Sequence, residues 1–403
     1  MSTSRARINY FILTLLLISF SFYGIISMQS AFDASKGGNR TISSIITLFI
    51  EVFYIINILN NIKYIGKSGL TKLVYVWMFF MFISVLVTSK SLDRLFKDIV
   101  YTQFWCLSYL YVFVMTKKKN FGIYLMKKYF LKIFIVNLLL FFYVFRLKFG
   151  ITSNFEGSNQ IYYPLLLLPW VFLLKEGKLK FLLLIVLLCG VIYSFKRNTM
   201  MLYSLCILIY IHHTYIKSDK SSTLIKGVFI IISLVLTLSY IGASSIESQY
   251  ILDRFTFEDL DKATGRKAIW YEVIELLKYN TTSTELVFGH GHNSVKDNVK
   301  IFGYNLSAHN DFLEVLFDYG LILLLFYIIL YLLLIKRLFY LKNNLKKYYV
   351  PYAVSLVLFG GMSMVSHLVL YPTFFIFTAC FWGAIESEIG LFKRKKYSQF
   401  LVK

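Results

Sequence analysis

The sequence predicts an all-α, polytopic integral membrane protein with about twelve transmembrane helices and one large external loop. Hydrophobic residues make up 58% of the 403 positions and charged residues only 16%, whereas a soluble domain carries roughly a quarter charged residues. Apolar runs of about 17–25 residues, the length that crosses a bilayer, recur along the whole chain. One connection, residues 244–311, contains no such run and is therefore expected to be functional rather than a spacer.

The predicted spans divide the chain into three parts. An N-terminal bundle of about nine helices (1–243) precedes the loop (244–311), and further helices with a basic tail follow it (312–403). The first run lacks a small-residue cleavage site and is interpreted as a retained helix. The twelve spans are expected at 9–29, 42–60, 73–88, 99–116, 129–146, 161–174, 181–195, 199–215, 227–243, 312–335, 350–371 and 373–390.

The formal charge of +22 is interpreted through the positive-inside rule, under which Lys and Arg gather in cytoplasmic connections. Alternate connections then carry 26 basic residues on one side and 9 in the short connections on the other. This places both termini in the cytoplasm and the loop on the periplasmic or outer face. The lipid bilayer thus accounts for the charge, and nucleic acid is not expected as a partner.

Within the loop, residues 263–279 (ATGRKAIWYEVIELLKY) have helical periodicity. One face of the predicted helix carries Trp270, Val273, Ile274 and Leu277, and Arg266 lies near its N-terminus. One interpretation is an amphipathic helix on the membrane surface. The alternative adds an anion site, since backbone N–H groups, the helix dipole and a guanidinium would face the same point.

Three of the six histidines lie in residues 289–320 (GHGHNSVKDNVKIFGYNLSAHNDFLEVLFDYG). A zinc site built from His290, His292 and His309 with Asp297 or Asp311 is an alternative, but the spacing fits no strong zinc signature. The acidic stretch at Glu258, Asp259 and Asp261 is interpreted as a solvated turn, because nucleotide sugars are cytosolic and the loop is external. No metal and no cofactor are expected.

His309 is the candidate base of this segment. Ser307 is expected to cap the tenth span, which would put His309 in the first helical turn. A helix N-terminus disfavours imidazolium, so His309 would be neutral and able to accept a proton. Asn310, Glu314 and Asp318 follow at four-residue spacing and would face a cavity or a partner. The alternative is a histidine that only caps a helix at the interface.

A second polar feature is the turn between the seventh and eighth spans. Lys196 and Arg197 would lie at the outer membrane surface, where a lipid phosphate would be found. Snorkelling to lipid headgroups would explain these two side chains taken alone. Together with Arg266 and His309, the turn indicates a site for a diphosphate leaving group beside a base.

These residues resemble the bacterial O-antigen ligase and Wzy-type polysaccharide polymerase superfamily over roughly 190–335. The turn "YSFKRNTMML" is similar to the family's Ser-Arg-Gly turn, and "TGRKAIW" resembles Gly-Arg-x-x-x-Trp. "VFGHGHNS" resembles the family's Gly-x-Gly, and "AHNDFLEVLFDYGLI" resembles His-Asn-x-x-Leu-x-x-x-x-x-x-Gly-Leu. Lys196 and Asn198 depart from the small residues that are commoner beside the arginine.

The resemblance implies a GT-C-like helical membrane glycosyltransferase that moves a glycan from undecaprenyl diphosphate to a sugar hydroxyl without a metal. Arg197 and Arg266 would hold the diphosphate, and His309 would act on the acceptor hydroxyl. Asn310 and Glu314 are expected to orient His309 or bind sugar hydroxyls, and Trp270 to pack in the loop or stack on a sugar. The further supporting or sugar-binding candidates are Lys196, Gly289, Gly291 and His292.

A polymerase of O-antigen, capsular or exopolysaccharide repeat units is preferred over a ligase that passes a finished chain to lipid A–core. A flippase and a chain-length regulator are candidate partners, and the bacterial inner membrane is the expected location. A transporter of lipid-linked glycans is the main alternative. It would place charged residues near mid-membrane, where only Glu51, Lys132 and His367 are candidates. A non-enzymatic receptor would leave the arginines and the His-Asn motif unconnected.

Overall fold

The computed structural model describes residues 7–19, 21, 40–65, 68–89, 91–118, 122–151, 159–194, 196–214, 266–301, 304–305, 307–365, 368 and 372–401. Almost all of them are helical, and two strands of two residues each pair antiparallel. The predicted ninth span (227–243) and the acidic stretch at 258–261 lie outside the described residues.

The first half of the chain is a bundle of long helices with one interrupted segment. Its elements are a helix at Arg7–Ser19, α2 (Arg40–Leu59), η1 (Ile62–Tyr64), α3 (Gly69–Thr88), α4 (Leu92–Lys117), α5 (Gly122–Ile151), η2 (Asn159–Ile161), α6 (Tyr162–Leu166), α7 (Leu168–Phe172), α8 (Lys178–Tyr193) and α9 (Arg197–Thr214). Ser68 and Ser91 cap α3 and α4 by accepting from the N–H groups of Thr71 and Arg94.

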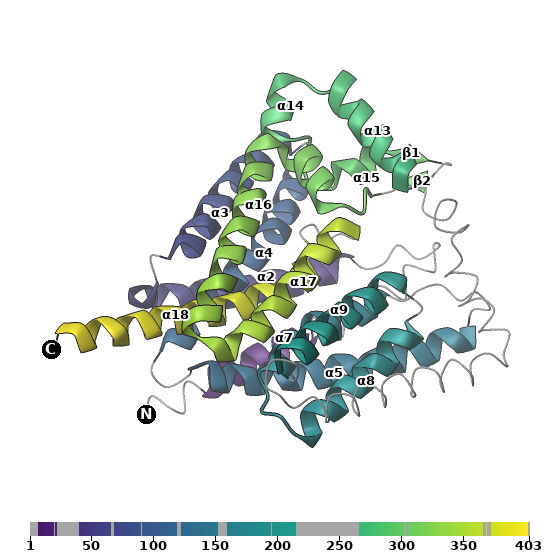
Figure 1. Cartoon of the computed structure of the whole chain (residues 1–403). Helices are drawn as coiled ribbons and strands as arrows, with labels where there is room; N and C mark the ends of the chain where they lie inside the picture. The colour runs from purple at the N-terminus through teal and green to yellow at the C-terminus, as the bar shows by residue number, and fades with distance from the viewer. Residues whose placement is uncertain are drawn as a thin grey trace.

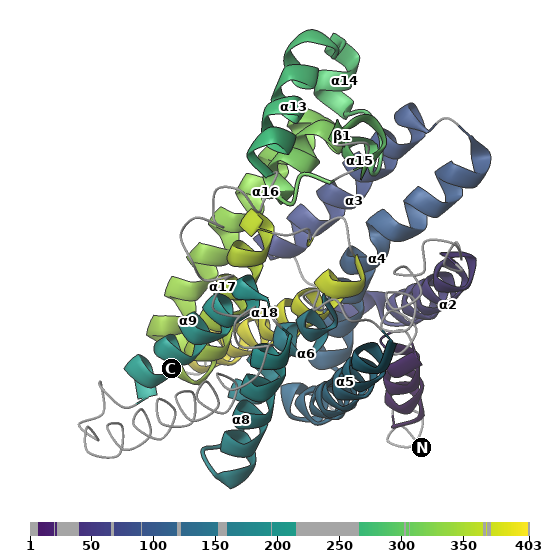
Figure 2. The same cartoon turned by 90° about the vertical axis from the view of Figure 1, so that its right-hand side faces the viewer.

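The second half contains the loop and the last helices. Its elements are α13 (Arg266–Tyr279), α14 (Ser283–Phe288), α15 (Ser294–Asn298), β1 (Lys300–Ile301), β2 (Tyr304–Asn305), α16 (Asp311–Asn344), η4 (Lys346–Tyr348), α17 (Tyr349–Val365) and α18 (Pro372–Leu401). Figure 2 shows α13, α14 and α15 gathered at one end of the molecule, over the ends of α3 and α16. We call this end the loop end.

The chain is a helical membrane protein. Among the described helices, α3, α4, α16 and α18 are long and apolar enough to cross a bilayer. Eleven of the twelve predicted spans coincide with helical segments, while the count of twelve and the GT-C-like fold stay predictions. α4 and α18 are largely buried at the centre, and α3 and α16 expose apolar side chains such as Phe79 and Leu332.

The predicted sixth span (161–174) is not one helix. Two five-residue helices, α6 and α7, replace it, and every residue from Gln160 to Phe172 is buried in protein. Pro164 and Pro169 explain the interruption, because proline lacks the N–H of a helix interior and clashes with the preceding turn. This segment is therefore part of the core of the bundle rather than a lipid-facing span.

The start of α9 packs against the end of α17. Leu202, near the start of α9, lies so close to Gly361, near the end of α17, that a Cβ at Gly361 would overlap its side chain. Ser363 at the same end of α17 is hydrogen-bonded to Tyr327 of α16, and Tyr327 contacts Asp311, the residue after the His-Asn pair. The start of α9 and the His309 segment are thus linked through the end of α17.

The end opposite the loop end carries basic residues, and ion pairs and hydrogen bonds join its helices. Arg337 of α16 and Glu386 of α18 are 2.5 Å apart, and the Tyr348 hydroxyl donates to Glu388. Lys180 is buried against the end of α7, where it bonds to the carbonyl oxygens of Phe172 and Leu174. In Figure 1 the end of α18 lies far from the loop elements.

Candidate functional site

The centre of the site is a reversal inside α16. The Tyr327 hydroxyl donates to Asp311 at 3.1 Å, and the Phe312 and Tyr327 rings are 5.2 Å apart. Sixteen residues of straight helix would separate Asp311 from Tyr327 by about 24 Å. Gly320, with φ 81°, interrupts the helix, so residues 311–319 fold back along residues 321–331. We call Asp311–Tyr319 the folded-back arm.

This reversal corrects the predicted tenth span. Residues 312–335 do not form one straight helix, because a positive φ at Gly320 cannot continue an α-helix. The part after Gly320 runs uninterrupted to Asn344 and exposes Leu325, Leu332 and Phe339. It is the stretch that can face lipid, while the folded-back arm is buried against protein.

Three carboxylates on the folded-back arm are fully buried, and each binds backbone N–H groups of a different segment. Asp318 accepts from Asn293 and Val295, both at 2.9 Å. Glu314 accepts from His309 at 3.0 Å, and Asp311 accepts from Leu368 at 2.9 Å. Buried carboxylates are tolerated when N–H donors satisfy them. The sequence predicts that Glu314 and Asp318 face a cavity or a partner. In the structure this partner is the backbone of the surrounding loops.

His309 lies just before the helix rather than in its first turn. Asn310, not Ser307, is the N-cap, and its Oδ1 accepts from the N–H groups of Phe312 and Leu313 at 3.0 and 3.3 Å. Asn310 has the extended backbone that an N-cap needs, whereas His309 has φ 54°. Glu314 holds His309 in this left-handed conformation through its backbone N–H, and the His309 side chain is half-buried.

α13 brings Arg266 to this segment. The Trp270 indole N–H donates to the Ala308 carbonyl at 2.7 Å, next to His309. Arg266 is the first residue of α13 and lies one turn, about 6 Å, before Trp270 on the same side. Ile269 and Val273 pack in a cluster with Val295, Val299, Ala308 and Phe317. The apolar face thus packs on the loop and the folded-back arm, which corrects the expectation of a helix lying on the membrane surface.

Trp270 is half-buried and anchored by its N–H, so it fixes the backbone before His309. Ile274, expected on the packed face, is 49% exposed. The physical reason is that the packed face is centred on Ile269 and Val273, and Ile274 lies about 100° further round the helix than Val273.

The turn at 196–199 is built tightly. Ser194 and Thr199 hydroxyls are 3.1 Å apart, and Thr199 also donates to the carbonyl of Lys196. The Lys196 ammonium bonds to Asn159 and lies over the Tyr162 ring. Arg197 begins α9, but its side chain lies outside the described part of the chain, so its diphosphate role stays a prediction.

The Gly-x-Gly segment joins α16 at the reversal. Because Gly320 interrupts the helix, the carbonyls of Phe317 and Asp318 are free to accept from His290 and Gly291, each at 2.9 Å. The Phe288 carbonyl accepts from Ser84 of α3 at 2.6 Å. The segment is thus fixed between two long helices, where its glycines allow close backbone packing, and a role of these glycines in sugar binding stays a prediction.

Residues 182–328 match the family model Wzy_C, described as O-Antigen ligase. This part of the chain is similar to the O-antigen ligase family. The matched range includes the start of α9, α13, the His309 segment and the reversal at Gly320. A search of curated proteins gives no match to the chain. The match supports the resemblance to the O-antigen ligase and Wzy-type superfamily that the sequence motifs show.

His292, within the matched residues, is buried among aromatic side chains. Its Nδ1 is 2.5 Å from the Tyr319 hydroxyl, and its ring lies between Tyr101 and Tyr319. Burial, with the nearby charges of Arg94 and Lys97, lowers the pKa of His292 to about 4. A neutral, enclosed imidazole stabilises the loop and is poorly placed to bind a sugar.

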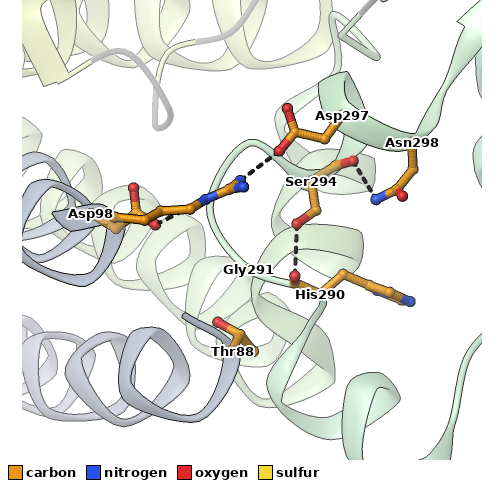
Figure 3. A pocket seen from close by; sticks show the side chains of 8 residues that line it. Thr88, Asp98, His290, Gly291, Ser294, Asp297 and Asn298 are labelled. Atoms are coloured by element: carbon orange, nitrogen blue, oxygen red, sulfur yellow. Dashed lines mark hydrogen bonds and ion pairs between the residues drawn. The ribbon is translucent and has the colours of Figure 1, made fainter. Parts of the chain in front are cut away.

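Sequence reasoning missed Arg94. It donates to Asp297 at 2.6 Å and to the His292 carbonyl at 3.0 Å, and it pairs with Asp98 on its own helix. Arg94, Asp98 and Asp297 line a polar recess between α3, α4 and the loop, and Figure 3 shows Asp98 and Asp297 beside it. In the sequence, Arg94 is one of several basic residues between the third and fourth predicted spans. Its acidic partner Asp297 is distant in the chain, and sequence spacing cannot reveal such a pair.

The three histidines of residues 289–320 have separate partners. His290 stacks on Phe317 and bonds its carbonyl through Nδ1 at 3.1 Å, His292 is enclosed by tyrosines, and His309 bonds to Glu314 through its backbone N–H. Among the described residues no group of three His, Cys, Asp or Glu side chains could hold a metal ion. The zinc alternative has no ligand set in this part of the chain.

Proposed function

We propose that the protein is a membrane glycosyltransferase that transfers an undecaprenyl-diphosphate-linked oligosaccharide to a sugar hydroxyl. The observation that carries this proposal is the hydrogen bond from Trp270 to Ala308, because it holds the start of α13 beside the His309 segment. An arginine at a helix N-terminus next to an imidazole suits a diphosphate leaving group beside a nucleophile. The O-antigen ligase family match supports the same class of enzyme.

In the proposed reaction the acceptor oxygen attacks the anomeric carbon, and the bond from that carbon to the diphosphate oxygen breaks. His309 takes the proton of the attacking hydroxyl, which contributes roughly a hundredfold to ten-thousandfold. Arg266 and Arg197 stabilise the charge on the departing diphosphate. Attack opposite the leaving group inverts the anomeric centre. Glu314 and Asn310 hold the backbone on either side of His309.

The preferred activity is polymerisation of O-antigen, capsular or exopolysaccharide repeat units. A ligase is the second candidate, because the matching family model describes O-antigen ligases. Basic residues at the end opposite the loop, together with the positive-inside rule, support cytoplasmic termini and a periplasmic loop in a bacterial inner membrane. A flippase and a chain-length regulator are the partners that such an enzyme would need.

The test is His309→Ala, read out by gel and mass analysis of surface and lipid-linked glycans in cells. Single repeat units in place of a length ladder identify a polymerase. A full ladder retained on the lipid carrier and missing from its final acceptor identifies a ligase. His212→Ala is the matched control, because His212 is exposed at the far end of α9. An unchanged glycan profile in His309→Ala, at wild-type protein levels, would refute the proposal.

A further inference from the structure

The residue that follows the His-Asn pair is the end of a buried hydrogen-bond chain. The Tyr327 hydroxyl donates to Asp311 Oδ2, and the Tyr327 and Ser363 oxygens are 2.8 Å apart. A tyrosine hydroxyl has one proton, so Ser363 must donate to Tyr327. Leu368 donates its N–H to Asp311 Oδ1 at 2.9 Å. All four residues are fully buried.

This chain of hydrogen bonds connects three parts of the fold that are far apart in the sequence. Asp311 begins the folded-back arm, Tyr327 lies on the membrane-facing part of α16, and Ser363 lies at the end of α17. The end of α17 also contacts α9 through Gly361 and Leu202. This set of bonds therefore joins the folded-back arm to the elements that contact the start of α9.

His309 is two residues from Asp311, with only the N-cap between them. Its backbone is held by Glu314, one turn further along the same folded-back arm. A shift of the folded-back arm would thus carry His309 with it. Misplacing a catalytic group by about 1 Å can lower a rate by about a hundredfold.

From this geometry we infer that Asp311 is a positioning residue, which fixes the location of His309 by joining the folded-back arm to Tyr327, Ser363 and the Leu368 backbone. Asp311 does not touch substrate in this role. The inference rests on the proposed function for its kinetic test, and it also predicts a change in the exposure of His309 that needs no glycan.

The decisive variant is Tyr327→Phe, which removes the hydroxyl and keeps the ring that packs on Phe312. We expect kcat for glycan transfer to fall roughly tenfold to a hundredfold, as a displacement of His309 by up to about 1 Å allows, with KM within about twofold of wild type. Tyr352→Phe is the control, because it removes a buried tyrosine hydroxyl elsewhere on α17.

Asp311→Asn and Asp311→Ala complete the test. Asparagine keeps an oxygen for the Leu368 N–H and an amide that can donate to Tyr327, so it should retain most activity, while alanine should lose at least about a hundredfold. If Asp311→Ala fails to fold, Tyr327→Phe still decides. Labelling of His309 by diethyl pyrocarbonate, followed by peptide mass spectrometry, should be faster in Tyr327→Phe than in wild type.

Wild-type kcat together with wild-type labelling in Tyr327→Phe would overturn the inference. If His309→Ala is active, the proposed function fails, yet the labelling rate in Tyr327→Phe still shows whether the chain positions His309. Faster labelling in the Tyr352→Phe control would also count against the inference, since any buried hydroxyl would then have the same effect.

Discussion

Gly289 and Gly320 lie backbone against backbone, although 31 residues of chain separate them. A Cβ on Gly320 would be 2.7 Å from the Gly289 nitrogen and would overlap the Val287 carbonyl, and a Cβ on Gly289 would overlap the Asp318 carbonyl. Both glycines have positive φ, 84° and 81°. The two glycine motifs that the sequence places in separate segments are therefore the two halves of one contact, and this contact fixes the reversal of α16.

Gly320→Ala should release the loop from α16. The substitution combines a strained left-handed backbone, about 1–3 kcal/mol, with an overlap that only a backbone shift can relieve. We expect a lower unfolding temperature in detergent and faster proteolysis between α13 and α15. Gly390→Ala is the control, because nothing lies within 4 Å of a Cβ at Gly390. Equal stability of the two variants would contradict the contact.

Arg266→Lys should impair transfer severely, because one ammonium cannot reproduce the two-point grip of a guanidinium on a phosphate. The expected loss in kcat/KM is roughly a hundredfold or more. Lys278→Ala serves as the control, since Lys278 is an exposed cation in the last turn of the same helix. The measurement is transfer from a purified lipid-linked oligosaccharide in detergent or liposomes, and normal rates in Arg266→Lys would remove the diphosphate assignment.

Trp270→Phe should distinguish the effect of the Trp270 hydrogen bond on the His309 segment from the effect of ring packing in the cluster. Phenylalanine keeps an aromatic ring in the cluster but loses the N–H that binds the Ala308 carbonyl. Loss of one such bond costs about 1 kcal/mol, and we expect a fall in kcat of about tenfold through displacement of the His309 segment. Tyr271→Phe, on the exposed side of α13, should leave kcat unchanged. A fall in both variants would show that the loss of kcat is not specific to the bond between Trp270 and Ala308.

His292 should make the folded protein less stable in acid. Its pKa is about 4 in the fold and 6.5 when unperturbed, so between these values the unfolded state binds more protons. Stability is therefore complete above about pH 6.5 and falls as the pH decreases toward 4. At pH 5 the loss is about 2 kcal/mol.

Thermal unfolding of wild type and His292→Asn at pH 7.5 and pH 5 checks this prediction. Asparagine does not titrate, so its variant should lose less stability on acidification. His212→Asn, at an exposed position, should keep the wild-type dependence. Parallel curves for wild type and His292→Asn would show that other groups cause the acid sensitivity.

Composition and hydropathy determined the fold class, since long apolar runs can be satisfied only as helices in a bilayer. Motif spacing showed the resemblance to the O-antigen ligase superfamily and selected the segment around His309. The capping residue was misassigned because Ser307 and Asn310 are both good N-caps by type, and only the backbone conformation at His309 decides between them.

What the tertiary structure alone decided are the contacts between segments that are distant in sequence. The reversal at Gly320 depends on its contact with Gly289, and the partners of Asp311, Glu314 and Asp318 are backbone groups of three separate segments. A helical period shows that Glu314 and Asp318 share a face, but it cannot show what satisfies a buried charge. That is decided by which N–H groups the fold brings within hydrogen-bond distance, and these belong to loops without regular spacing.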